Sequence, residues 1–133
     1  MINHIIDNIF LGDWQDAKYH QKEFDEIFTV AKDSPFVGNH FYGLVDGPYP
    51  DNEILLPNAI DDLLNVRKKD WQLGKRILVH CVGGFSRSVT VVSGYIIAEG
   101  YEHDVEDAIY RIRKIRPLAN PNPEFVRLLK NMI

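Results

Sequence analysis

Apolar and polar residues follow one another along the first part of this chain in patterns that favour strands. Residues 5–12 are predicted to form two short strand pieces around an Asp-Asn turn, closed by a glycine. Asp13 is predicted to cap a short helix that reaches Tyr19. Apolar side chains dominate 24–31 and 41–45, which predicts two more strands. The chain is therefore expected to begin with strands and one short helix.

The spacing of apolar residues in the second part of the chain favours helices instead. Apolar residues recur at helical intervals within 57–73. This segment begins with a proline and is followed by Gly74, a residue type that commonly ends helices. Nearly every side of 88–98 is apolar, which predicts a central buried helix. The predicted elements are a helix over 57–73, a strand over 76–80, a helix over 88–98, a helix capped by Asp104 and ended by Pro117, and a helix from about 123 to 132.

Strands that alternate with helices predict an α/β fold. We expect a single domain over 1–133 with a central, mostly parallel mixed sheet of four to five strands flanked by helices. A chain of 133 residues with 45% hydrophobic content is large enough for one such core. Ligands of these sheets bind beyond the carboxyl ends of the strands. Cys81 and Asp46 both follow predicted strands, so we expect them at one site.

The composition excludes several classes of function. A net charge of -4 at pH 7 argues against a general nucleic-acid or membrane-surface binder, because phosphate groups would repel the average surface. We expect no signal peptide, because residues 1–4 lack a basic head and Asp7 interrupts the first apolar run, and no run approaches the apolar length of a membrane span. The single cysteine permits no intramolecular disulfide, which favours reducing surroundings and a cytoplasmic location. The oligomeric state is not predicted.

The only cysteine lies where a predicted strand passes into the central helix. Two glycines separate them, and the backbone N–H groups of 82–87 are expected to curl around one point that the positive end of the helix dipole also faces. Arg87 is close enough to complete this ring with two parallel hydrogen bonds to phosphate-type oxygens. A thiol in such a field is expected to ionise and act as a nucleophile. The stretch therefore predicts binding of a phosphate monoester and attack of Cys81 on its phosphorus.

The motif around this cysteine resembles that of a known enzyme family. His80-Cys81-x-x-Gly84-x-x-Arg87-Ser88 resembles the signature of the cysteine-dependent protein tyrosine phosphatases, and Gly84-Phe85-Ser86-Arg87-Ser88 is most similar to the small dual-specificity branch. The resemblance implies that Cys81 is the nucleophile, that Arg87 binds two phosphate oxygens, and that Ser88 donates a hydrogen bond to the departing sulfur. A plain helix cap stays open as the alternative for Ser88. It also implies a substrate-binding loop made of Val82, Gly83, Gly84, Phe85, Ser86 and Arg87.

The resemblance implies further site residues outside this loop. An alkoxide or phenoxide leaves poorly without a proton, and Asp46 matches the family's general acid by its place before the long helix. Asp51 lies on the same loop and stays open as the alternative, in which case Asp46 is only a turn residue. His80 resembles the residue that braces the phosphate loop from behind. Asn122 resembles a late asparagine that supports the loop, with Asn120 as an alternative and a helix cap as the plain interpretation of either.

Residues near the expected site bear on the substrate. Phe85 and Tyr49 are candidates for a rim that packs on a phenyl ring, or are simply exposed aromatics. A basic cluster near the end of a helix is expected to compensate the helix dipole or to dock acidic substrate segments. Its members are Arg111, Arg113, Lys114 and Arg116.

Together these features predict a phosphoprotein phosphatase. It is expected to hydrolyse phosphotyrosine, and also phosphoserine or phosphothreonine, through a phosphocysteine intermediate and without a metal or cofactor. The variable loop positions add no lysine or arginine beyond Arg87, which disfavours a polyanionic lipid substrate. Two alternatives stay open. One is a phosphatase for an RNA 5′-triphosphate, a sugar phosphate or a lipid phosphate, and the other is a non-catalytic phosphate-binding module.

Overall fold

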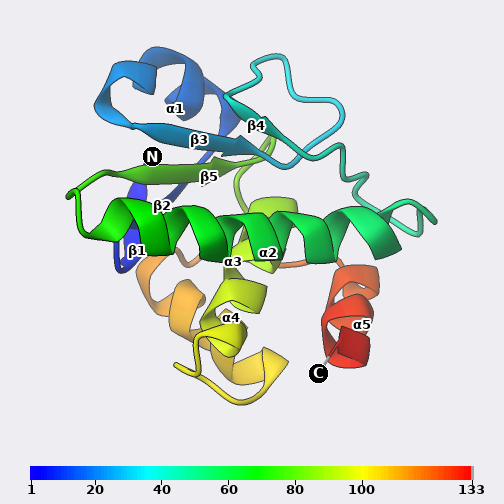
Figure 1. The fold of residues 1–133 in the computed structure, drawn as a ribbon. Coiled ribbons are helices and arrows are strands. Elements are labelled where there is room, and N and C mark those ends of the chain that lie inside the picture. The colour runs from blue at the N-terminus through cyan, green and yellow to red at the C-terminus, as the bar shows by residue number, and fades with distance from the viewer. Residues whose placement is uncertain (133) are drawn as a thin grey trace.

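Five strands form one mixed sheet in the computed structural model, which describes residues 1–132. The strands are β1 (Asn3–Ile6), β2 (Ile9–Gly12), β3 (Glu26–Thr29), β4 (His40–Phe41) and β5 (Ile77–His80). Their order across the sheet is β1-β2-β5-β3-β4, and only the β1–β2 hairpin is antiparallel. The predicted α/β fold with a mostly parallel mixed sheet flanked by helices is therefore confirmed (Figure 1).

Helices cover both faces of this sheet because side chains alternate along its strands. The helices are α1 (Trp14–Tyr19), the short 3-10 helix η1 (Gln21–Glu23), α2 (Asn52–Trp71), α3 (Arg87–Ala98), α4 (Val105–Ile115) and α5 (Pro123–Met132). On β5, Leu78 packs in the smaller apolar cluster with Ala17 of α1, whereas Ile77 and Val79 belong to the main core. The main core lies between the sheet and α2 to α5.

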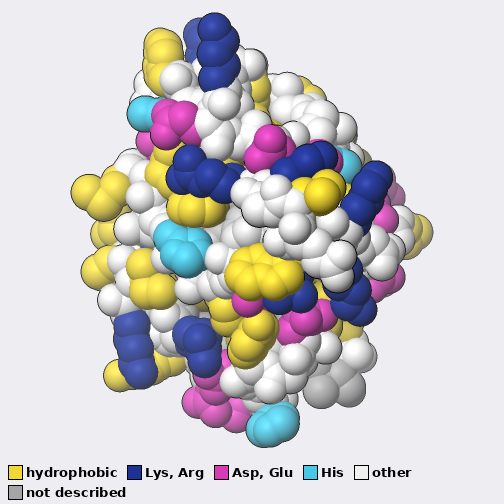
Figure 2. Space-filling view, turned by 60° about the vertical axis from the view of Figure 1, so that its left-hand side comes forward, with side chains coloured by type: hydrophobic (Ala, Val, Ile, Leu, Met, Phe, Trp, Pro, Cys, Tyr) yellow, Lys and Arg dark blue, Asp and Glu magenta, His cyan; other side chains and the backbone are white. Residues whose placement is uncertain are grey.

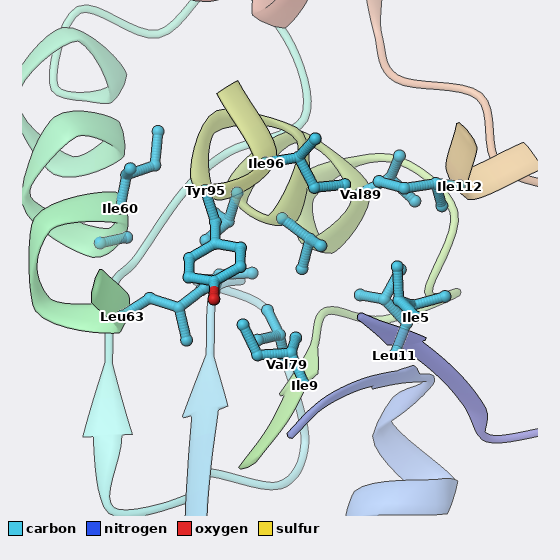
Figure 3. Packing of buried hydrophobic residues seen from close by; sticks show 14 of the residues in the cluster. Ile5, Ile9, Leu11, Ile60, Leu63, Val79, Val89, Tyr95, Ile96 and Ile112 are labelled. Atoms are coloured by element: carbon cyan, nitrogen blue, oxygen red, sulfur yellow. The ribbon is translucent and has the colours of Figure 1, made fainter. Parts of the chain in front are cut away.

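Helix α3 lies at the centre of the main core. Every residue from Arg87 to Ile96 is buried, as the all-round apolar pattern predicted. Figure 3 shows Leu63 of α2, Tyr95 of α3 and Val79 of β5 sharing one apolar space. A Cβ on Gly94 would lie 2.2 Å from Ile60 Cδ1, so α2 and α3 pack closely at this point. This packing fixes the N-terminus of α3, which directly follows the loop of residues 81–86 that contains Cys81.

Several element ends agree with the sequence pattern. The β1–β2 turn contains Asp7 with φ 52°, and Asp13 caps α1 by accepting a 2.7 Å hydrogen bond from Asp16 N. Asp104 caps α4 through Asp107 N in the same way. The final helix spans the expected residues. The predictions for these elements are confirmed.

The helix predicted over 57–73 begins five residues earlier, at Asn52, and ends at Trp71. We expected Pro57 in the first turn, where its missing N–H does no harm, but it lies inside α2. The preceding turn forms because Ile54 N and Leu55 N both donate to Asp51 O. The Asn52 side chain also hydrogen-bonds to the backbone of Val45 and Gly47 in the preceding loop. These bonds define the start of the helix at Asn52, five residues before the proline.

The strand predicted over 41–45 is also wrong in its extent, because only His40 and Phe41 pair with β3. Tyr42 N still donates to Thr29 O of β3 at 2.8 Å, but the backbone groups of Leu44 and Val45 find partners outside the sheet. Leu44 O accepts from Lys32 N at 2.9 Å and from the Arg87 side chain at 3.0 Å. The backbone N–H and C=O of Val45 both bond to the Asn52 side chain. The strand predicted over 24–31 is likewise shorter, since β3 covers only Glu26–Thr29.

The surface carries mixed charges. Figure 2 shows a face on which Lys and Arg side chains alternate with Asp and Glu, so this face has no large patch of one sign. Among residues 1–132, no helix has the length and apolar character needed to cross a membrane.

Candidate active site

The loop between β5 and α3 turns its carbonyl groups toward other parts of the protein. The bonds run from His80 Nδ1 to Cys81 O, Trp14 N to Val82 O, Arg116 Nε to Gly84 O, Asn120 N to Phe85 O and Thr90 N to Ser86 O, at 2.7–3.2 Å. The N–H groups of Val82, Gly83, Phe85 and Ser86 find no acceptor within the described part of the chain. The loop thus leaves a set of backbone donors available to a bound anion.

Gly84 is required by the geometry of this loop. Its φ is +74°, in the left-handed region that glycine adopts without strain. A Cβ there would lie 2.6 Å from both Gly12 O and Arg116 Nη2. Any side chain at Gly84 would therefore displace the backbone that surrounds Cys81.

Cys81 is the first residue of the loop, with 2% of its surface exposed. Its Sγ is 3.2 Å from Ser88 Oγ in the first turn of α3 and 3.3 Å from Gly84 N. Both groups can donate a hydrogen bond to a negatively charged sulfur, and the N-terminus of α3 adds the positive end of its dipole. The structure thus brings Cys81, Gly84 and Ser88 together.

His80 holds the loop from the β5 side. It is fully buried, and its Nδ1 lies 3.0 Å from Cys81 O. A carbonyl oxygen only accepts, so Nδ1 carries the proton and Nε2 accepts from Thr29 Oγ1 at 2.7 Å. Burial lowers the pKa of His80. The imidazole is therefore a neutral residue whose two hydrogen bonds fix its orientation.

Arg87 is 7% exposed and is bound through one of its nitrogens. Its Nη1 donates to Asp33 Oδ1 at 2.5 Å and to Leu44 O at 3.0 Å. No residue of the described range 1–132 accepts a hydrogen bond from Nε or Nη2. The Nε and Nη2 edge is thus unpaired in the described residues and has the geometry to bind two oxygens of an anion.

Asp33 was missed as a site residue by the sequence analysis. The hydrogen bond from Arg87 is the main cause that lowers the pKa of Asp33. Asp33 follows the carboxyl end of parallel strand β3, on the same side of the sheet as Cys81. The rule that sites lie beyond such ends was the only signal that could have found it.

Asp46 contacts the loop between β5 and α3 directly. Ser86 Oγ donates to Asp46 Oδ1 at 2.9 Å, although the two residues are 40 positions apart. Asp51 lies at the start of α2, and within residues 1–132 its side chain makes no capping bond. The structure therefore joins Asp46, and not Asp51, to the loop around Cys81.

Asn52 anchors the loop that carries Asp46, and sequence reasoning did not single it out. This side chain is 1% exposed and bonds to the backbone on both sides of Asp46. It accepts from Val45 N at 3.1 Å and donates to Val45 O at 2.8 Å and Gly47 O at 3.0 Å. The carboxylate is thus carried by a loop whose base is fixed.

The two late asparagines contact the phosphate loop through their backbone. Asn122 N donates to Ser86 Oγ at 3.0 Å, and Asn120 N donates to Phe85 O at 2.7 Å. The Asn122 side chain instead accepts from Glu124 N at 2.9 Å, which is the contact of a helix cap. Asn122 therefore touches the loop without using its amide side chain.

The basic cluster near the end of α4 does not form a uniform exposed patch. Arg116 Nε bonds to Gly84 O at 2.7 Å, and its Nη1 bonds to Asn3 Oδ1 at 2.7 Å. Arg111 pairs with Glu102, and Arg113 donates to Ala119 O. At least Arg116 thus supports the phosphate loop from behind.

Phe85 is an exposed residue of the loop, whereas Tyr49 is partly buried in the segment before α2. Phe85 is 46% exposed, and a Cβ on Gly83 would lie 2.1 Å from its ring. Lys32 Nζ lies 5.3 Å from the centre of the Tyr49 ring.

In the part of the chain that the structure describes, no group of three His, Cys, Asp or Glu side chains could hold a metal ion.

Comparisons with known proteins agree with this geometry. The family model for the dual specificity phosphatase catalytic domain matches residues 9–132. Human dual specificity protein phosphatase 22 is 46% identical over 134 residues, which cover 97% of this chain and 72% of that protein. The putative tyrosine phosphatase 123R of Invertebrate iridescent virus 6 is 30% identical over 129 residues, covering 94% of this chain and 87% of the viral protein.

Some curated relatives are longer than the matched region. Dual specificity protein phosphatase 22 of Xenopus tropicalis is 27% identical over 135 residues, and the match covers 98% of this chain but 64% of that protein.

Solved structures show the same fold. The crystal structure of DUSP15 matches with a TM-score of 0.78 at 24% identity, covering 98% of this chain and 86% of that one. Human DUSP28 matches with a TM-score of 0.78 at 22% identity, covering 98% and 90%. Because the family model spans nearly the whole sequence and the human relative agrees over the same range, this chain belongs to the family of dual specificity phosphatase catalytic domains.

Proposed function

We propose that this protein is a phosphatase for phosphotyrosine, and also for phosphoserine or phosphothreonine, in proteins. The observation that carries the proposal is the loop around Cys81. Its carbonyl groups bond outward, while four backbone N–H groups and one edge of Arg87 are left without protein acceptors in the described residues. Such a ring of donors around a sulfur suits a phosphate monoester.

In the first step, Cys81 Sγ attacks phosphorus and the bond to the leaving oxygen breaks. The backbone N–H groups and the Nε and Nη2 edge of Arg87 hold the three non-bridging oxygens as charge shifts onto them. Asp46 gives its proton to the leaving oxygen, and its hydrogen bond with Ser86 keeps the acid at the loop. The products of this step are the dephosphorylated hydroxyl and a phosphocysteine.

In the second step, water attacks phosphorus and the bond from phosphorus to sulfur breaks. The Asp46 carboxylate takes the proton of the attacking water, which restores the acid for the next cycle. Ser88 Oγ, 3.2 Å from Sγ, donates to the sulfur as it regains negative charge. Inorganic phosphate leaves, and the thiolate is regenerated.

The residues at the site support a protein substrate over a polyanionic one. Arg87 is the single basic residue among residues 82–87, so the loop has little charge to spare for a second or third phosphate. The half-exposed Phe85 offers an apolar surface beside the loop for the rest of the substrate. Since the nucleophilic thiol has to stay reduced, we also propose a cytoplasmic location.

The proposal is tested with p-nitrophenyl phosphate, a panel of phosphopeptides, a 5′-triphosphorylated RNA and an inositol phospholipid. We expect turnover of the aryl phosphate and the peptides, unaffected by a chelator, and a phosphoenzyme that acid quenching traps on Cys81. Cys81→Ser should abolish turnover but keep vanadate binding, because the backbone donors and Arg87 are unchanged. Faster turnover of the RNA or the lipid would contradict the substrate class. Binding of phosphopeptides without any turnover would show a non-catalytic module.

A further inference from the structure

The guanidinium of Arg87 is held at one nitrogen by two acceptors from different segments. Asp33 follows β3 and Leu44 follows β4, and both bond to Nη1. An Nη1 group has only two hydrogens, so these two bonds use all of its donors. Because a guanidinium is planar, fixing both N–H bonds of Nη1 also fixes the plane and the direction of the opposite edge.

The acceptors are themselves tied to one another. Lys32, the neighbour of Asp33, donates its backbone N–H to Leu44 O at 2.9 Å. Leu44 O therefore accepts from Lys32 and from Arg87 at once, and the three residues form one frame. The Asp33 carboxylate is 67% exposed, whereas the Arg87 side chain is 8% exposed. The buried member is thus the group to be positioned, and the exposed member can be replaced without opening the core.

We propose that Asp33 is a positioning residue for Arg87, which turns the Nε and Nη2 edge toward the phosphate. This inference rests on the proposed function, since it assigns to Arg87 the phosphate-binding role. Asp33 itself does not touch the substrate in this mechanism. Its charge-assisted hydrogen bond selects one orientation of a side chain that would otherwise keep a single acceptor, Leu44 O.

A role for Asp33 as a competitor of phosphate predicts the opposite change in oxyanion binding. If its carboxylate only competed with phosphate for Arg87, its removal would strengthen oxyanion binding. The contacts favour positioning, because Asp33 occupies Nη1 and leaves the edge that can bind two oxygens unpaired within residues 1–132.

The test compares Asp33→Ala and Asp33→Asn with the wild type. Vanadate, which adopts the trigonal-bipyramidal arrangement of the transition state, should bind about tenfold more weakly to Asp33→Ala, a loss limited by the exposure of the carboxylate. Inhibition by inorganic phosphate should change much less, and kcat should fall more than KM rises. Asp33→Asn keeps an acceptor oxygen, so its affinity for vanadate should lie between those of the wild type and Asp33→Ala. Asp62→Ala removes another exposed carboxylate, paired with Tyr42, and should match the wild type.

A double-mutant cycle separates positioning from a general effect of charge. In an Arg87→Ala background, Asp33→Ala should not weaken vanadate binding further. Unchanged or tighter vanadate binding by Asp33→Ala, or an equal loss with and without Arg87, would overturn the proposal. The binding measurement needs no turnover, so it still decides the role of Asp33 if the wild type hydrolyses none of the substrates.

Discussion

Replacing Asn52 by alanine would remove the side chain that holds the backbone on both sides of Asp46. Three hydrogen bonds of 2.8–3.1 Å would be lost, to Val45 N, Val45 O and Gly47 O. Each bond has a net worth of about 1 kcal/mol, and a buried group left unsatisfied costs about 1–3 kcal/mol. Water can reach part of this loop, so we expect a loss of about 2–4 kcal/mol in the free energy of unfolding and a fall in Tm of roughly 5–15 °C.

The same change should also impair catalysis in a recognisable way. A positioned general acid contributes about a hundredfold or more, and a mobile loop would forfeit a large part of it on substrates with poor leaving groups. An activated aryl ester needs little protonation and should be hydrolysed at a nearly normal rate. The ratio of kcat/KM between an alkyl phosphate and the aryl ester therefore reports the position of Asp46 separately from general loss of folded protein.

The assay pairs urea denaturation with this kinetic ratio. Asn58→Ala is the matched control, because Asn58 is an exposed asparagine on the same helix. The control should leave the kinetic ratio unchanged and raise the free energy of unfolding by no more than about 0.7 kcal/mol, the gain in helix propensity. If Asn52→Ala kept the wild-type ratio while losing the expected stability, the side chain would serve folding alone. An unchanged free energy of unfolding would refute the argument from its three bonds.

Three further predictions follow from the site. Asp46→Asn should lower the rate on alkyl phosphates or phosphotyrosine about a hundredfold and the rate on an activated aryl ester much less. If Asp51→Asn reproduces this pattern and Asp46→Asn does not, the acid is Asp51. Ser88→Ala should slow the second step, so that stopped-flow traces show a burst of phenol and quenched samples hold more phosphocysteine; equal phosphoenzyme levels in both proteins would contradict its role. Burial lowers the pKa of His80, so below about pH 6.5 this imidazole binds a proton in the unfolded chain but stays neutral in the folded chain. Folding stability should therefore be complete above that pH and fall by up to about 1.4 kcal/mol per pH unit below it, and His80→Asn should flatten this slope in denaturation at pH 7 and 5.5.

Local patterns were sufficient for much of the fold and for the centre of the site. The burial of α3 followed from apolar spacing, and α5 has the bounds that the sequence predicted. The loop around Cys81 could be placed because a strand, two glycines and a helix are consecutive in the sequence. Its roles in catalysis remain predictions, but its place between β5 and α3 agrees with the sequence interpretation.

The strand predicted over 41–45 and the start of α2 differ from the prediction for one physical reason, which is hydrogen bonding to partners outside the element itself. Residues 42–45 have the composition of a strand, yet Leu44 O bonds to Arg87, 43 positions away. Asp33 and Arg87 are separated by 54 positions, so no local pattern could pair them. The early start of α2 depends on the side chain of Asn52, whose bonds run back to the preceding loop. Helix and strand propensities depend on the residue itself and its local sequence, so they do not include hydrogen bonds to partners outside the element.

The hydroxyl of Ser86 makes the two oxygens of Asp46 chemically different. An amide N–H can only donate, so Asn122 N occupies a lone pair of Ser86 Oγ and the single hydroxyl proton goes to Asp46 Oδ1. Oδ1 is thereby already an acceptor, and a proton bound to the carboxyl group belongs on Oδ2. In the proposed mechanism the transferable proton of Asp46 is therefore carried by Oδ2, and we expect the leaving oxygen of the substrate to be bound next to that atom.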